Sequence, residues 1–288
     1  MNESVIALVF DFDGTLGPDT ISSLVSSHGN DVKEFWTYVD ELVEAGWDPP
    51  LAYTHLLLTY QREGKVDLSQ KNLRAIGKKL SLFPGLPKAF IELREFIQKA
   101  PELKGVRICV EFYIISGGIE EIILGSSIAR HMNGIFGCNF SYDEKVATGI
   151  KSVISFTEKT RFLYGINKGV GAQELRSNPY KINDALSQDD RRVPFSQMLY
   201  IGDGPSDIPC LSAIIQHGGT GIGVSSPTTS FKKGYELARG KRITVGPYTA
   251  NYKKDSDMRK VLEETMLRIG LEIVIDRKKH VVQAPKVG

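Results

Sequence analysis

Two acidic residues lie two positions apart immediately after an apolar segment near the start of the chain. Asp11 and Asp13 follow Val5 to Phe10 and are succeeded by Gly14 and Thr15. Two carboxylates this close repel each other, and a bound divalent cation would relieve the repulsion. Mg²⁺ binds one or two carboxylates together with phosphate oxygens and waters, so the pattern suits a metal-assisted phosphate site. A solvated Asp-rich turn is the alternative interpretation, and further motifs must decide between them.

A hydroxyl residue ends a second apolar segment, Arg107 to Ile115. Ser116 is followed by two glycines, the first of them Gly117. Glycine lets the backbone approach a ligand closely, so the Ser116 hydroxyl and the neighbouring N–H groups could hold a phosphate. Taken alone, this pattern has little specificity.

A third apolar segment also ends in carboxylates. Tyr200 to Gly202 precedes Asp203, and Asp207 follows one turn later. Gly, Pro and Ser occupy the positions between them, and these residues are also typical of ordinary turns. The position after another apolar segment favours a ligand site, because open α/β sheets bind ligands at the carboxyl ends of their strands.

The elements that must position these residues are short apolar segments rich in β-branched residues. We expect buried parallel strands at 5–10, 107–115, 198–201, 221–224 and 242–245. Helical patterns separate them, including one that begins at Pro87 and a final helix that begins at Ser256 or Asp257 and ends before Gly270. Alternating strands and helices predict a doubly wound α/β fold with a parallel sheet covered on both faces.

Nearly a hundred residues separate the first two predicted strands, which is far more than a simple crossover needs. Their helical patterns predict a mainly helical cap at 17–82, inserted into a catalytic core made of 1–16 and 83–276. Alternation of apolar and polar residues over 136–156 predicts a hairpin flap, and the basic segment 277–288 is expected to be a loosely ordered tail.

The composition narrows the class of protein. Thirty-six basic and thirty-four acidic residues are interspersed, so nucleic acid is not an expected partner. Apolar stretches are shorter than the ~20 residues of a membrane span, so no membrane association is expected. Cys109, Cys138 and Cys210 are far apart and odd in number, as expected for free thiols in the cytoplasm. Composition leaves the oligomeric state open.

In their order, these motifs resemble the haloacid dehalogenase-like superfamily. The sequence has Asp-x-Asp-Gly-Thr at Asp11, a strand ending in Ser116, a lysine, and Gly-Asp-x-x-x-Asp ending at Asp207. It looks most like the phosphoserine phosphatase-type branch, because two glycines follow Ser116, Asn139 lies in the flap, and the Asn-Lys-Gly at Lys168 is similar to the lysine motif of that branch.

The resemblance implies a Mg²⁺-dependent phosphatase that forms an aspartyl-phosphate. Asp11 would be the nucleophile and Asp13 the general acid and base. Asp11, the backbone carbonyl of Asp13 and Asp203 would hold the Mg²⁺, with Asp207 as a supporting residue.

The phosphoryl group would be bound by Ser116, Gly117 and Lys168. Choosing Lys168 requires a surface insertion around 177–192 to explain its distance from Asp203, and Lys159 is the alternative.

The expected substrate is a small phosphorylated metabolite, more specifically a phosphate monoester. Phosphoserine would require an acidic residue where this chain has Thr20, although Asp19, Arg62 and Glu63 leave an amino-acid substrate open. Phosphotransfer, mutase activity on the same fold, and a non-catalytic module that binds magnesium or a phosphate ligand are the other possibilities, and the complete set of acidic residues favours hydrolysis.

Overall fold

The computed structural model describes residues 4–187, 190–227 and 232–283. Its strands form one sheet in the order β4-β3-β2-β1-β5-β6-β7, in which only the β3–β4 pair is antiparallel. The strands are β1 (Ser4–Phe10), β2 (Ile108–Ile119), β3 (Gly134–Asp143), β4 (Val146–Ser152), β5 (Met198–Gly202), β6 (Thr220–Ser225) and β7 (Val245–Thr249). The order reverses around β1, which confirms the predicted doubly wound α/β fold.

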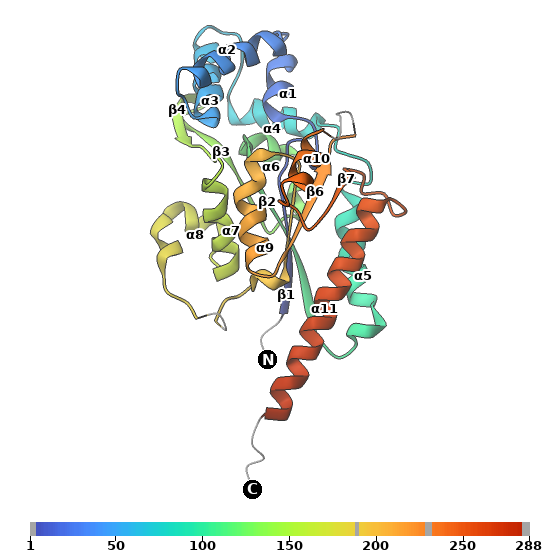
Figure 1. Ribbon diagram of the computed structural model, residues 1–288. Coiled ribbons are helices and arrows are strands. Elements are labelled where there is room, and N and C mark those ends of the chain that lie inside the picture. Colours follow the sequence, from blue (N-terminus) through green and yellow to red (C-terminus); the bar gives the residue numbers. More distant parts are fainter. Residues whose placement is uncertain (1–3, 188–189, 228–231, 284–288) are drawn as a thin grey trace.

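Helices cover both faces of the sheet because β1 buries both of its faces. Val5, Ala7 and Val9 pack with α7 (Glu158–Lys168) and α9 (Ile208–Gln216) on one face. The alternate residues of β1, such as Ile6 and Leu8, pack with α5 (Lys88–Lys99) and α11 (Asp257–Gln283) on the other, where Figure 1 shows these two helices side by side. Burial on both faces accounts for the continuous apolar sequence of this strand.

Two strands differ from the expected ranges. β2 continues through Ser116 and Gly117 to Ile119 instead of stopping at Ile115. The last strand begins where the predicted segment 242–245 ends, and it contains Pro247. Proline is tolerated there because β7 lies at the edge of the sheet and one side of its backbone has no neighbouring strand.

Four helices fill the long connection between β1 and β2, as the sequence predicts. They are α1 (Thr20–Ser27), α2 (Val32–Glu44), α3 (Pro49–Arg62) and α4 (Gln70–Lys79). Local sequence sets their starts: the Asp31 carboxylate accepts from the N–H groups of the first turn of α2, Pro49 opens α3, and Ser69 caps α4. Helices α1–α3 lie beyond the carboxyl end of β1 (Figure 1).

The last helix of this insertion, α4, is pressed against α6 (Glu120–Gly125) of the core. A Cβ on Gly77 would lie 1.9 Å from the Ile122 carbonyl oxygen, and one on Gly125 would lie 2.2 Å from the Arg74 carbonyl oxygen. Arg74 also pairs with Glu121 at 2.6 Å. Glycine at these two positions therefore allows α4 and α6 to pack backbone against backbone, which holds α4 to the core. The other helices of the insertion, α1–α3, face the carboxyl ends of the strands (Figure 1).

Hairpin β3–β4 confirms the predicted flap, and Gln61 of α3 donates to the Ala147 carbonyl at 2.6 Å. The other short helices are α8 (Ala172–Ser177) and α10 (Lys232–Arg239). In place of a helix that ends before Gly270 and a loose tail from Arg277, α11 continues through Gln283, and Arg277 bonds to Ser4 at 2.8 Å. The rest of the predicted tail, 284–288, lies outside the described residues. Across the described ranges, we find no helix with the length and apolar character of a membrane span.

Candidate active site

The carboxyl ends of three adjacent strands meet below the helices α1–α3. Asp11 and Asp13 follow β1, Ser116 lies on β2, and Asp203 follows β5. A cavity of about 1280 Å³ opens there, and its lining includes Asp11, Asp13 and Asp203. The fold therefore brings together the three motifs that the sequence singled out.

A lysine at the start of α7 joins two of the carboxylates. Lys159 Nζ lies 2.9 Å from Asp11 Oδ1 and 2.7 Å from Asp207 Oδ1, and its side chain is 2% exposed. Burial alone would lower the pKa of Lys159, but Asp11 and Asp207 outweigh it and the pKa is raised. Lys159 is therefore a fixed positive charge beside Asp11.

Lys168, at the other end of α7, lies away from this cavity. Its Nζ donates to the carbonyl oxygens of Ile182 and Asp184, in the segment that precedes β5. The structure thus corrects the expected placement of Lys168 and puts Lys159, the alternative, beside Asp11. The physical reason is that nine residues on a helix span two and a half turns, which places the two lysines on opposite faces about 13 Å apart along the axis.

Asp207 is held by four hydrogen-bond donors. Its Oδ1 accepts from Lys159 and from the Tyr200 hydroxyl at 2.8 Å, while Oδ2 accepts from the backbone N–H of Asp203 at 3.1 Å and of Gly204 at 3.3 Å. A carboxylate with both oxygens occupied in this way suits a positioning role better than metal ligation. It orients Lys159 and the loop that carries Asp203.

The remaining acidic residues fit a hard divalent cation. One carboxylate oxygen each from Asp11, Asp203 and Asp207 lie within 4.8 Å of one another. Gly14 has no side chain, and a Cβ there would come within 2.4 Å of Asp203 Oδ2, so this position must be glycine for Asp203 to reach the cluster. Because hydrogen-bond donors already occupy both oxygens of Asp207, Asp11 and Asp203 are the carboxylates suited to Mg²⁺. Mg²⁺ is usually bound by one or two protein carboxylates.

Mg²⁺ binding is expected to weaken as the pH falls below about 6. Burial raises the pKa of Asp11 to about 6, an effect that Lys159 opposes and Asp207 adds to. Below this value a proton competes with the metal for Asp11, so affinity should fall about tenfold for each further pH unit. Calorimetric titration with Mg²⁺ at several pH values measures this, and an affinity that does not change between about pH 7 and about pH 5 would contradict it.

Asp13 is held by a residue that sequence reasoning did not assign to the site. The Thr20 backbone N–H donates to Asp13 Oδ1 at 2.8 Å and its hydroxyl to Oδ2 at 3.2 Å, while the same hydroxyl accepts from the Ile119 N–H at 3.3 Å. A Cβ on Gly118 would come within 2.5 Å of Asp13 Oδ2, so glycine is required at that position also. In the sequence, Thr20 is distinguished only as the position where a phosphoserine substrate would require an acidic residue.

The same carboxyl group has a raised pKa. Burial is the largest cause, the charges of Asp19 and Asp11 add to it, and the donors from Thr20 oppose it. A raised pKa favours the protonated form of the carboxyl group, which is the form that a general acid requires.

Ser116 and Gly117 lie at the bend of β2 beside Asp13. The Ser116 hydroxyl accepts from the Gly118 N–H at 2.9 Å, and Gly117 lines the cavity. The Gly117 carbonyl accepts from the Tyr53 hydroxyl at 2.6 Å and from the Cys138 thiol at 3.0 Å. Of the predicted pair, Gly117 lines the cavity and Ser116 is buried directly behind it, and Tyr53 of α3 connects this bend to the inserted helices.

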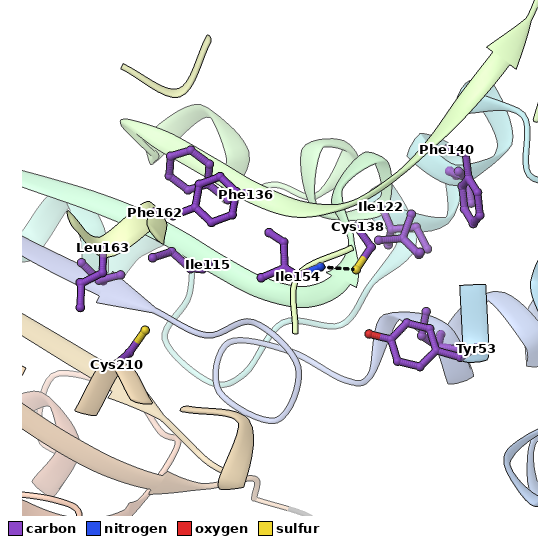
Figure 2. Close-up of a cluster of buried hydrophobic side chains, with 14 of the residues drawn as sticks. Tyr53, Ile115, Ile122, Phe136, Cys138, Phe140, Ile154, Phe162, Leu163 and Cys210 are labelled. Atoms are coloured by element: carbon purple, nitrogen blue, oxygen red, sulfur yellow. Dashed lines mark hydrogen bonds between the residues drawn. The ribbon is translucent and has the colours of Figure 1, made fainter. Parts of the chain in front are cut away.

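Cys138 is packed in the apolar cluster behind this bend, between Ile122 and Ile154 (Figure 2). Its sulfur accepts from the Ile154 N–H at 3.3 Å, and burial raises the pKa of the thiol to about 12. Cys138 and Cys210 are buried and free, as expected, while Cys109 is half-buried.

Cys138 is therefore expected to resist alkylation in the native protein. Iodoacetamide reacts with the thiolate, which at about pH 8 makes up only about 10⁻⁴ of a thiol with this pKa. Mass spectrometry of protein treated before and after unfolding would test this. Native modification of Cys138 as fast as in the unfolded chain would show that the packing around it is wrong.

Comparison with known proteins now bears on this geometry. No family model matches the sequence. The chain is 31% identical over 242 residues to an uncharacterized protein of Borreliella burgdorferi strain B31, covering 75% of this chain and 81% of that protein. The two proteins belong to one family.

Solved structures identify the fold. A phospho-aspartyl intermediate analogue of phosphoserine phosphatase matches with a TM-score of 0.51 and 14% identity, over 91% of this chain and 99% of that chain. The protein has the haloacid dehalogenase-like fold of the phosphoserine phosphatase type. A haloacid dehalogenase (HAD) family hydrolase from Salmonella enterica serovar Typhi also matches, with a TM-score of 0.50 and 18% identity over 83% of this chain. The chain spans 66% of the length of that hydrolase.

The solved structures confirm the resemblance in fold that the order of the motifs indicated. Asp11 and Asp13 lie at the carboxyl end of β1 in this fold. This fold carries an acidic cluster beside a buried lysine.

Proposed function

We propose that the protein is a Mg²⁺-dependent phosphatase that hydrolyses a small phosphate monoester through an aspartyl-phosphate on Asp11. The observation that carries the proposal is the buried contact of Lys159 with Asp11 and Asp207, next to Asp13 with its raised pKa. A carboxylate nucleophile, a fixed cation and a carboxyl group with a raised pKa lie at one end of the sheet.

In the first step, an Asp11 carboxylate oxygen attacks phosphorus as the bond from phosphorus to the ester oxygen breaks. Asp13 gives its proton to the departing alcohol oxygen. Thr20 holds both oxygens of Asp13, which fixes the direction of that transfer. Lys159 compensates negative charge on the transferring group, with Ser116 and the N–H groups around Gly117 as further donors.

In the second step, the ionised Asp13 removes a proton from water, and the water oxygen attacks phosphorus. The bond between phosphorus and Asp11 breaks, which releases inorganic phosphate and restores the Asp11 carboxylate. A Mg²⁺ held by Asp11, the Asp13 carbonyl and Asp203 would supply charge neutralisation between carboxylate and phosphate. Asp207 acts through Lys159 and the Asp203 loop.

The compartment and partners follow from the same reasoning. The three cysteines form no disulfide, which suits the reducing cytoplasm, where a small phosphorylated metabolite would be the partner. We propose that helices α1–α3 act as a cap that selects this metabolite, because each of them contributes residues to the cavity lining, among them Ile21, Trp36 and Tyr53.

Hydrolysis of p-nitrophenyl phosphate and a panel of small phosphate esters, with and without Mg²⁺, tests the proposal. We expect phosphate release that requires the metal. Release of the phosphoryl group to an added alcohol or sugar phosphate in place of water would indicate a phosphotransferase or mutase. Mg²⁺ binding without turnover of any ester would indicate a binding module.

A further inference from the structure

The cavity continues beyond the catalytic carboxylates to a wall made by the inserted helices. Trp36 and Asp40 of α2 and Tyr53 of α3 line it, together with Asp19 from the loop before α1. Asp13, the proposed donor to the leaving alcohol, is hydrogen-bonded to Thr20 at the start of the same insertion. This wall is therefore where the leaving group of a bound ester would lie.

Two aromatic rings form a corner in the wall. Trp36 and Tyr53 meet edge to face, with centroids 5.9 Å apart and planes at 73°. Their polar atoms are already used, because Trp36 Nε1 donates to Ser22 Oγ at 3.0 Å and the Tyr53 hydroxyl donates to the Gly117 carbonyl at 2.6 Å. These bonds fix the rings, so the corner presents aromatic surface to a ligand in a preorganised form.

The charge of the wall is negative. Asp19 and Asp40 line it, and among the described lining residues Lys159 is the one cation. Lys159 lies at the phosphate end, in contact with Asp11 and Asp207. A leaving group that carries a carboxylate or a second phosphate would be repelled here, whereas a cation would be attracted.

The aromatic corner and one of these carboxylates, Asp40, lie side by side on the wall. Asp40 follows Trp36 by four residues on α2, so the two side chains lie on the same side of that helix. An ammonium group is bound in proteins by aromatic faces, and a nearby carboxylate adds direct charge attraction. A phosphorylated amino acid would also need a cation near its carboxylate. Arg62 at the end of α3 does not supply one, because it is not among the residues that line the cavity.

We propose that this wall binds a positively charged leaving group, so that the substrate is the phosphate monoester of an amino alcohol that has an ammonium group and no carboxylate. The proposal rests on the proposed phosphatase function and names its substrate class.

A pair of esters with one shape and different charge tests it. Phosphocholine carries a quaternary ammonium, and 3,3-dimethylbutyl phosphate replaces the nitrogen by carbon. We expect kcat/KM to be about tenfold or more higher for phosphocholine, and higher for phosphoethanolamine than for phosphoserine. Equal values for the first pair, or a preference for phosphoserine, would overturn the proposal. Failure on every ester, p-nitrophenyl phosphate included, would instead remove the phosphatase function.

A variant and a binding measurement keep the test independent of turnover. In Asp40→Asn, the ratio of kcat/KM between the two esters should fall several-fold, roughly the contribution of one close charge. Glu41→Gln, an exposed position on α2 outside the cavity lining, should keep the wild-type ratio. Calorimetry with the Asp11→Asn variant should show tighter binding of phosphocholine than of 3,3-dimethylbutyl phosphate, whose alkyl group carries no charge, and equal binding would contradict the proposal.

Discussion

Asp11→Asn is expected to lower phosphate release by at least about 10⁴-fold at saturating Mg²⁺ and substrate. The change removes the nucleophile, so the covalent intermediate cannot form. The second step, which hydrolyses that intermediate, then has no substrate. The amide is almost the same size as the carboxylate, so the site keeps its shape. The initial rate with p-nitrophenyl phosphate is the measurement.

Folding should survive this substitution, because Lys159 keeps its contact with Asp207 at 2.7 Å. Circular dichroism and thermal unfolding of Asp11→Asn would establish that. Asp143→Asn, at an exposed position at the end of β3, is the matched control and should retain wild-type activity. Activity of Asp11→Asn within about tenfold of wild type would exclude Asp11 as the nucleophile.

Lys159→Met is expected to damage both stability and catalysis. It leaves the carboxylates of Asp11 and Asp207 buried without the cation between them, and the exposed fractions of these side chains are 6% and 0%. Removing one partner of a buried ion pair costs about 3–5 kcal/mol of the free energy of unfolding. The loss of the positive charge beside the phosphoryl group should lower kcat by about 10²–10³-fold. Urea unfolding and steady-state kinetics measure the two effects.

Lys168→Met separates the two lysines of α7. Lys168 bonds to backbone carbonyls of the segment before β5 and has no contact with the acidic cluster, so kcat should stay within about twofold of wild type. If the two variants lost activity equally, the assignment of Lys159 to the site would be wrong. Mg²⁺ is expected to restore part of the stability of Lys159→Met by neutralising Asp11, and unfolding measured at several Mg²⁺ concentrations tests this.

The carboxylates of the site could be predicted from the sequence because each follows its strand directly. Asp11 and Asp203 directly follow β1 and β5, and the carboxyl ends of neighbouring parallel strands lie at one edge of the sheet. Ser116 lies within β2, which continues to Ile119, so only its place near the strand end could be predicted. The starts of α2 and α4 are set in the same local way, since Asp31 and Ser69 cap these helices through bonds to nearby residues.

The choice of lysine required the direction of a helix relative to the sheet. A helix that follows the flap starts near the carboxyl ends of the strands, so a first-turn residue such as Lys159 can reach the site, whereas the last residue, Lys168, points to the other end. The prediction of Lys168 rests instead on the resemblance of Asn-Lys-Gly to a family motif. Glycine at 169 instead ends the helix in the left-handed conformation, with φ of 77°.

Other parts of the site depend on contacts between distant segments. Thr20, which holds Asp13, also bonds to Ile119, 99 positions away in the sequence. Trp36 meets Tyr53 only after α2 and α3 have packed together. The saturation of Asp207 by four donors likewise needs the folded loop. No spacing rule in the sequence encodes these contacts.

Trapping the covalent intermediate tests the central claim most directly. Asp13→Asn should form the aspartyl-phosphate slowly and hydrolyse it more slowly still, because the base for the second step is absent. Borohydride reduces an aspartyl-phosphate to homoserine, which mass spectrometry can locate in the peptide that contains 11–13. We predict Mg²⁺- and substrate-dependent conversion of Asp11, and none at Asp203 or Asp207. An enzyme that releases phosphate while Asp11 is never converted, or conversion at another aspartate, would contradict the account.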